Sequence, residues 1–243
     1  MTTITTARAP GMPRPRRTSP GRALVHVIGE LMITVGVVML LLVVYQLFWT
    51  NIESNRESQK IENNLRQSWA SGAKIPNGAI GIMYIQRLGK TWEKPIVQGV
   101  DLDNLAKGVG HFTETQLPGE TGNFAVAAHR ATHGEPFAHL DSIEVGDKIV
   151  VETKTDFFTY VVDKMPGGTA EHPAWKLVDP NFGAVVLPVP EKPGAVPTKK
   201  EITLVTCNPR WGHTTRLIVY GHLTEDIKKS TGEKPAALNY FKG

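Results

Sequence analysis

The sequence lacks a second cysteine, because Cys207 is the only one among 243 residues. A lone cysteine cannot form an intramolecular disulfide, so the fold must be stabilised by its core. A hydrophobic content of 41% and a charged content of 21% are ordinary for a folded protein and indicate an adequate core. Cys207 is therefore a small buried apolar residue, a free thiol or a nucleophile, and residue type alone leaves the three open.

Acidic residues are absent from the first 22 positions, which are rich in Thr, Pro and Arg. Without the five arginines of this segment, the 27 basic residues fall to 22, against 23 acidic ones, so the rest of the chain is nearly neutral. A basic arm of this kind could bind nucleic acid. The segment that follows favours another interpretation, in which residues 1–22 are an unfolded cytoplasmic tail. The arginines are Arg8, Arg14, Arg16, Arg17 and Arg22.

Charge is also absent from the 19 residues between positions 31 and 49. About 20 apolar residues suffice for a helix to cross a bilayer, and Tyr45 and Trp49 are side chains favoured at its interface. We therefore predict a transmembrane anchor over residues 23–49. The arginine-rich flank stays in the cytoplasm, so everything after residue 50 lies outside the cell membrane and no nucleic acid is expected as a partner. The alternative is a cleaved signal peptide, but no small-residue cleavage site follows the stretch.

Residues 50–75 form a polar spacer with few large apolar side chains. Ile61, Leu65 and Trp69 recur at four-residue spacing, which predicts one thin apolar stripe on a helix. The segment could simply lift the next domain off the membrane, or its stripe could cap that domain. The pattern is compatible with both.

From Pro76 onward, short apolar runs alternate with turn residues, without an internal repeat. They predict about eight strands over residues 76–224, and hence an all-β barrel or sandwich. Short helical segments are expected at 102–109 and 136–140. The charged, weakly patterned segment 225–243 is expected to be a tail. The predicted strands are 79–85, 94–98, 123–129, 148–152, 157–162, 184–187, 202–206 and 217–221.

Two strands of this plan end at residues that can do chemistry. Cys207 follows one directly, and an Asn-Pro turn signal ends the strand just after the sulfur. His129 ends another, so the thiol and the imidazole emerge at one rim if the two strands are neighbours. A cysteine nucleophile needs such a base. Arg216, nine residues after Cys207, could return across a hairpin to stabilise an oxyanion, and Arg210 in the intervening loop competes for this role. Packing or surface roles for these residues remain open at this point.

The same segments resemble the sortase family. Residues 203–207 read Thr-Leu-Val-Thr-Cys, which matches the signature Thr-Leu-X-Thr-Cys, and Arg216 lies on the following strand. Residues 123–130 resemble the strand that carries the histidine of that family. The similarity runs through residues 76–224 and is most like class E sortases of high-GC Gram-positive bacteria. The chain departs from the family pattern at Ala128, where glycine is frequent, and at His133, where class E commonly has tyrosine.

The resemblance implies an all-β fold, a closed eight-stranded sortase-type barrel with short helices, preceded by one transmembrane helix. It also implies a cysteine transpeptidase. Cys207 would attack the Thr–Gly carbonyl of a C-terminal sorting signal, Leu-Pro-X-Thr-Gly or Leu-Ala-X-Thr-Gly. His129 would protonate the departing amine, and Arg216 would stabilise the oxyanion.

The partners implied are secreted proteins that bear a sorting signal and a peptidoglycan precursor amine. No cofactor and no metal are expected, because the histidines are scattered and no carboxylate has ligand spacing with them. Two other classes of function remain. One is a hydrolase that uses the same residues with water as acceptor. The other is an anchored β domain without activity, in which Cys207 only packs.

Overall fold

The computed structural model describes residues 20–73 and 78–242 and divides into two units, residues 1–45 and 46–243. The first unit contains helix α1, Pro20–Val44, of which Gly21–Val44 is long and apolar enough to cross a membrane. At about 1.5 Å per residue, 24 residues exceed the ~30 Å hydrocarbon core of a bilayer. The expected apolar helix is therefore present, although its α-helical part ends at Val44 rather than at residue 49. Most of the predicted tail, residues 1–19, lies outside the described residues.

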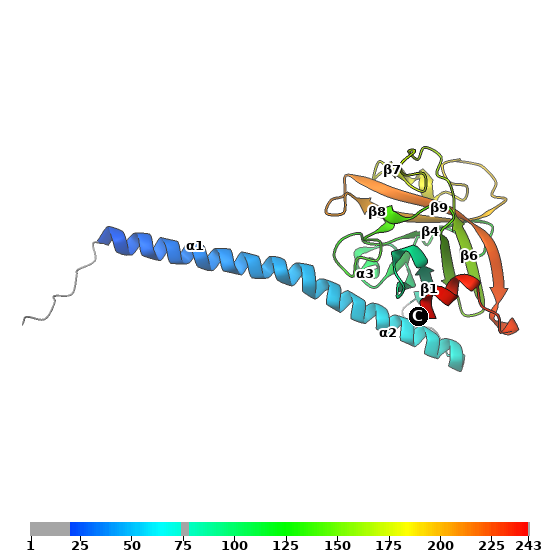
Figure 1. Cartoon of the computed structure of the whole chain (residues 1–243), viewed down its shortest axis with the longest axis horizontal. Coiled ribbons are helices and arrows are strands. Elements are labelled where there is room, and N and C mark those ends of the chain that lie inside the picture. Colours follow the sequence, from blue (N-terminus) through cyan, green and yellow to red (C-terminus); the bar gives the residue numbers. More distant parts are fainter. Residues whose placement is uncertain (1–19, 74–77, 243) are drawn as a thin grey trace, which may run out of the picture. The chain divides into compact units, whose positions relative to one another are not determined.

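A π-helical turn, Tyr45–Trp49, precedes helix α2, Thr50–Ser71, which belongs to the second unit (Figure 1). Ile61 and Leu65 of α2 are almost wholly buried in one apolar cluster with residues of the sheet. The thin stripe of this helix therefore caps the domain, which was one of the two alternatives that the sequence left open.

Within the described residues, nine strands form one sheet in the order β6-β5-β1-β2-β3-β4-β8-β9-β7. A further pairing of β6 with β9 closes the first eight of these into a barrel, which confirms the expected fold (Figure 1). The sheet is mixed, since β2 with β3 and β4 with β8 run parallel. The strands are β1 (Ala79–Ile85), β2 (Glu93–Gln98), β3 (Val109–His111), β4 (Gly122–Ala127), β5 (Lys148–Glu152), β6 (Asp156–Val162), β7 (Lys176–Val178), β8 (Lys200–Asn208) and β9 (Thr215–Lys228).

Short helical segments connect the strands, and three of them correct the sequence-based plan. The expected strand 184–187 is a 3₁₀ turn, because so short an apolar run has no strand preference of its own and pairs with no neighbour. The expected helix 102–109 stops at Leu105, because the chain then extends into β3. The expected turn at 136–140 lies slightly later, at residues 140–142. The segments are η3 (Gln86–Leu88), α3 (Leu102–Leu105), η4 (Leu140–Ser142), η5 (Gly183–Val186), η6 (Lys229–Thr231) and η7 (Ala236–Lys242).

The end of the chain is also more ordered than expected. Strand β9 continues to Lys228, because β6 pairs with it along this length and thereby closes the barrel. After η6, Ala237 and Leu238 are buried in the same cluster as Ile61 of α2. Residues 225–242 are therefore part of the folded domain rather than a tail, and long-range packing rather than local pattern holds them.

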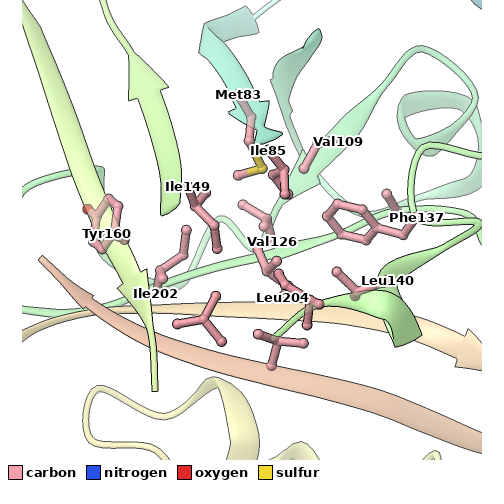
Figure 2. Packing of buried hydrophobic residues seen from close by; sticks show 14 of the residues in the cluster. Met83, Ile85, Val109, Val126, Phe137, Leu140, Ile149, Tyr160, Ile202 and Leu204 are labelled. Atoms are coloured by element: carbon pink, nitrogen blue, oxygen red, sulfur yellow. The ribbon is translucent and has the colours of Figure 1, made fainter. Parts of the chain in front are cut away.

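The interior of the barrel is filled by side chains from opposite strands. Figure 2 shows Met83, Ile149, Val126 and Leu204 pointing toward one another, and all four are fully excluded from solvent. Burying one such side chain stabilises the fold by roughly 1.5–3 kcal/mol. A filled interior leaves the outer faces and the rim of the barrel as the places where a ligand can bind.

Candidate active site

Cys207 and Arg216 face each other across the hairpin of β8 and β9. The ladder pairs Cys207 with Arg216 and Val205 with Ile218, so the nine-residue step between cysteine and arginine is the return of an antiparallel hairpin. Side chains alternate along a strand, so Val205 and Cys207 share one face of β8, while Leu204 and Thr206 turn to the buried side. Cys207 is a free thiol of intermediate exposure, so the structure favours a reactive position over a core one.

His129 is brought to the other side of Cys207 by the parallel pairing of β4 with β8. The last pair of this ladder is Ala127 with Val205, and the amide of Ala128 donates to the carbonyl of Val205 at 3.2 Å. His129 and Cys207 each follow two residues later, so the two segments run side by side, which is the condition that the sequence had left open. The strand itself ends at Ala127, earlier than expected, and His129 lies in the loop that follows.

Thr206 fixes this register at the point where the ladder ends. Its buried hydroxyl donates to the carbonyl of Ala128 at 2.8 Å. The hydrogen bond joins the residue before the cysteine to the residue before the histidine. The sequence contained Thr206 as part of a motif, but no local pattern indicates which carbonyl it binds.

The electrostatic surroundings of His129 favour a neutral imidazole. Burial lowers the pKa of His129, and the neighbouring His133 lowers it further. The two rings stack with centroids 5.0 Å apart. A neutral imidazole beside a thiol can accept its proton, which is the property required of a general base.

Arg216 lines an apolar cavity of about 200 Å³ on the outer face of β8 and β9. Its Nη1 donates to the carbonyls of His213 (3.1 Å) and Thr215 (3.2 Å), which orient the guanidinium. Val205, on the same face of β8 as Cys207, lines the cavity too, so the cavity lies on the face of the β8–β9 hairpin that carries the thiol. Most of the remaining wall is apolar: Phe112, Val178, Pro180, Phe182, Val185, Val186 and Ile218.

The competing arginine, Arg210, is engaged elsewhere. Its guanidinium pairs with the carboxylate of Glu135 in the loop after His129 and lies over the Trp211 ring, 5.6 Å from the centroid. This arrangement favours Arg216, the strand partner of Cys207, as the donor to an oxyanion.

Arg130 is a second residue whose role the sequence did not predict. It is 6% exposed, donates to the side-chain oxygen of Asn208 and pairs with Asp141 at 2.9 Å. It therefore ties the residue after His129 to the residue after Cys207. An arginine next to the histidine was visible in the sequence, but its partners lie 11 and 78 positions away.

The other histidines have different surroundings. His111 is buried and bonded to Gln98 (2.6 Å), and burial lowers its pKa. His222 contacts Asp163 at 2.7 Å, and His172 stacks on Trp175. In the part of the chain that the structure describes, no group of three or more His, Cys, Asp or Glu side chains could hold a metal ion.

A larger cavity, of about 890 Å³, lies away from these residues. Lysines and acids line it, among them Lys164, Lys200 and Glu201, together with Tyr220. None of Cys207, His129 and Arg216 belongs to its wall, so the smaller apolar cavity is the one that adjoins the candidate site.

Comparisons with known proteins point to one family. The family model described as the sortase domain matches residues 83–224. Sortase SrtE1 of Streptomyces coelicolor is 36% identical over 237 residues, which are 92% of this chain and 64% of that protein, so the chain spans slightly less than two thirds of this curated relative. The structure of sortase E from Streptomyces avermitilis is 39% identical, with a TM-score of 0.56 over 67% of this chain and 97% of that chain.

A second solved structure bears on ligand binding. The structure of sortase E1 from Streptomyces coelicolor with a tripeptide in the active site is 33% identical, with a TM-score of 0.57. It covers 68% of this chain and 99% of that chain. The expected resemblance to class E sortases is confirmed by these relatives.

Proposed function

This chain belongs to the sortase family, and on that premise we propose that it is a membrane-anchored cysteine transpeptidase with Cys207 as nucleophile. His129 is the general acid and base, and Arg216 is the oxyanion donor. The observation that carries the proposal is the register of β4, β8 and β9, in which Cys207 pairs with Arg216 on one side and runs beside His129 on the other.

The first half of the reaction forms a thioester. His129 takes the proton from the Cys207 thiol, and the sulfur bonds to the threonine carbonyl carbon of the sorting signal. The bond between this carbon and the glycine nitrogen then breaks, and His129 gives the proton to the departing amine. The substrate is left as an acyl group on Cys207, and the glycine end leaves as a free amine.

The second half transfers the acyl group to an acceptor amine. His129 removes a proton from the incoming amine, whose nitrogen bonds to the thioester carbon and displaces the sulfur. The thiol recovers its proton and the acyl group is joined by an amide bond. The acceptor we propose is an amine of a peptidoglycan precursor, which attaches the substrate protein to the cell wall.

Arg216 and the apolar cavity have separate roles in this reaction. The guanidinium, held by two backbone carbonyls, stabilises the negative charge that develops on the carbonyl oxygen in both half-reactions. The cavity beside it takes an apolar side chain of a sorting signal of the Leu-Ala-X-Thr-Gly or Leu-Pro-X-Thr-Gly kind. Support comes from the relative that binds a tripeptide in its active site.

The apolar helix Gly21–Val44 would anchor this domain in the cell membrane, with the arginine-rich N-terminus in the cytoplasm. The catalytic domain then lies outside, where secreted substrates and lipid-linked precursors of the wall meet. Protease protection in intact cells tests this topology: the catalytic domain is expected to be cleaved from outside, and its protection would contradict the orientation.

A transpeptidation assay tests the activity. The full chain in detergent is mixed with peptides carrying each sorting signal and with triglycine as the amine, and products are identified by mass spectrometry. We expect a transfer product, no product with Cys207→Ala, and a loss of roughly 10²–10³-fold in rate with Arg216→Ala. Cleavage without a transfer product would make the protein a hydrolase instead.

A further inference from the structure

The loop that follows the active-site histidine has an unusual backbone. We call residues 129–137 the histidine loop. In it Thr132, His133, Gly134 and Glu135 are consecutive and all left-handed, with φ of 62°, 48°, 76° and 47°. Only glycine adopts this conformation freely, so three of the four residues need contacts from outside the loop to hold them there.

Helix α2 supplies such contacts through Asn51 in its first turn. The amide of Gly134 donates to Asn51 Oδ1 at 2.9 Å, and Asn51 Nδ2 donates to Glu135 Oε1 at 2.9 Å. One side chain thus satisfies two groups at the tip of the histidine loop. A Cβ atom on Gly134 would lie 3.2 Å from Asn55 Oδ1 and 3.4 Å from Ser54 Cβ, so the loop tip also lies directly against this turn of α2.

The same tip is held from the side of Cys207. The other carboxylate oxygen of Glu135 pairs with Arg210, which belongs to the loop after the cysteine. Glu135 Oε1 also accepts from the amide of Thr132 at 3.3 Å. Glu135 is therefore a junction of three segments: α2, the histidine loop and the β8–β9 loop.

Helix α2 is itself firmly placed on the barrel. Besides the buried Ile61 and Leu65, Arg66 pairs with Glu93 of β2 at 2.7 Å, and Ser58 donates to the carbonyl of Lys107 at 2.6 Å. A helix held at several points along its length presents Asn51 in a fixed position. The contact is therefore one between two ordered elements.

We propose that α2 is part of the active site and that Asn51 is a positioning residue, which holds the histidine loop so that His129 stays beside Cys207. The inference rests on the proposed role of His129. Asn51 touches neither the thiol nor the imidazole. It acts through the loop tip that carries His133, which stacks on His129. The segment after the apolar helix thereby becomes a component of catalysis as well as a support.

Kinetics of the full chain in detergent test the proposal. Asn51→Ala is expected to lower kcat about 10–100-fold with little change in KM, since a small misplacement of a catalytic group has this effect. The acidic limb of the kcat/KM profile should move to higher pH, because a looser loop buries His129 less. The matched control is Asn64→Ala, an exposed asparagine on the same helix, which should behave as the wild type.

A pair of further variants separates positioning from folding. Asn51→Asp keeps the size of the side chain but sets a carboxylate against that of Glu135, and is expected to lower kcat as Asn51→Ala does. Adding Glu135→Gln restores a donor opposite the new acceptor, and the double variant should recover most of the lost kcat. If kcat falls in Asn51→Asp and does not recover in the double variant, the pairing of residues 51 and 135 is overturned.

Hydrogen–deuterium exchange distinguishes failure of this inference from failure of the proposed function. Faster exchange of residues 130–136 in Asn51→Ala, with the barrel unchanged, supports the positioning contact whatever the chemistry. Wild-type kcat and exchange in Asn51→Ala, while His129→Ala is inactive, overturns this inference alone. Full activity in His129→Ala overturns the proposed function. If the exchange of residues 130–136 is also unchanged in Asn51→Ala, the positioning contact is overturned as well.

Discussion

At the scale of single residues, the site depends on hydrogen bonds made just outside the strands that carry it. Thr206 joins the segments of Cys207 and His129 through one buried hydroxyl at 2.8 Å from the Ala128 carbonyl. Arg130 joins the same two segments through Asn208. These side chains set where Cys207 and His129 lie, and neither has a role in the proposed bond-making steps.

Replacing Thr206 with valine tests the first of these links. Valine keeps the shape but leaves the Ala128 carbonyl without its donor, so we expect a loss of about 1–3 kcal/mol in the free energy of unfolding and a lower kcat/KM. Urea unfolding and peptide cleavage measure the two effects. Thr206→Ser retains the hydroxyl and should stay close to wild type, and equal losses in both variants would contradict the account.

Replacing His133 with alanine tests the electrostatics of His129. Burial and the adjacent His133 both lower the pKa of His129, and removing the ring weakens both influences. The pKa of His129 should therefore rise, and the acidic limb of the kcat/KM profile should shift to higher pH. His139→Ala removes an exposed histidine nearby and should leave the profile unchanged. A shift to lower pH in His133→Ala would refute this explanation.

At the scale of elements, α2 packs on the barrel through buried apolar side chains and through charged ones. Leu65 is 1% exposed, and Leu65→Ala is expected to cost about 2–5 kcal/mol of unfolding free energy, because it leaves a cavity between helix and sheet. Ile52→Ala, on an exposed position of the same helix, should cost less than about 0.5 kcal/mol. Similar losses at the two positions, measured by urea unfolding in detergent, would mean that α2 does not pack as described.

The charged groups between α2 and the barrel predict that the free energy of unfolding depends on pH. Burial, with the nearby carboxylate of Glu93, raises the pKa of Glu62 to about 7, although Lys94 and Arg66 act in the opposite direction. The folded protein thus binds a proton that the unfolded chain releases near pH 4.5. This stabilising contribution is complete below pH 4.5 and is lost as the pH rises through 7.

Glu62→Gln should remove this dependence, because glutamine mimics the neutral carboxyl. We expect the variant to gain unfolding free energy relative to wild type at pH 8 and to match it near pH 4.5, as measured by urea unfolding at both values. A relative gain that is larger at low pH than at high pH would have the wrong sign for a buried carboxyl with a raised pKa.

At the scale of the whole molecule, the sequence revealed those parts that have local patterns. The apolar helix, the main strands and the residues Cys207, His129 and Arg216 were predicted from apolar runs, turn residues and family motifs. What local pattern could not predict were contacts between distant positions. Two such contacts exist only after the barrel has closed. One is the burial of Leu238 near the end of the chain, and the other is the hydrogen bond from Asn51 to Glu135, which lie 84 positions apart. The prediction of a strand at 184–187 was wrong for a related reason, since pairing with a neighbouring strand decides whether so short a segment is a strand.

The central claim, that Cys207 becomes acylated by a sorting signal, has one direct measurement. The full chain is incubated with a sorting-signal peptide without an added amine, and its intact mass and proteolytic fragments are then recorded. The account predicts one added acyl group per chain, located on Cys207, absent from Cys207→Ala and discharged when triglycine is added. Cleavage of the peptide by Cys207→Ala at the wild-type rate, or an acyl group on another residue, would contradict it.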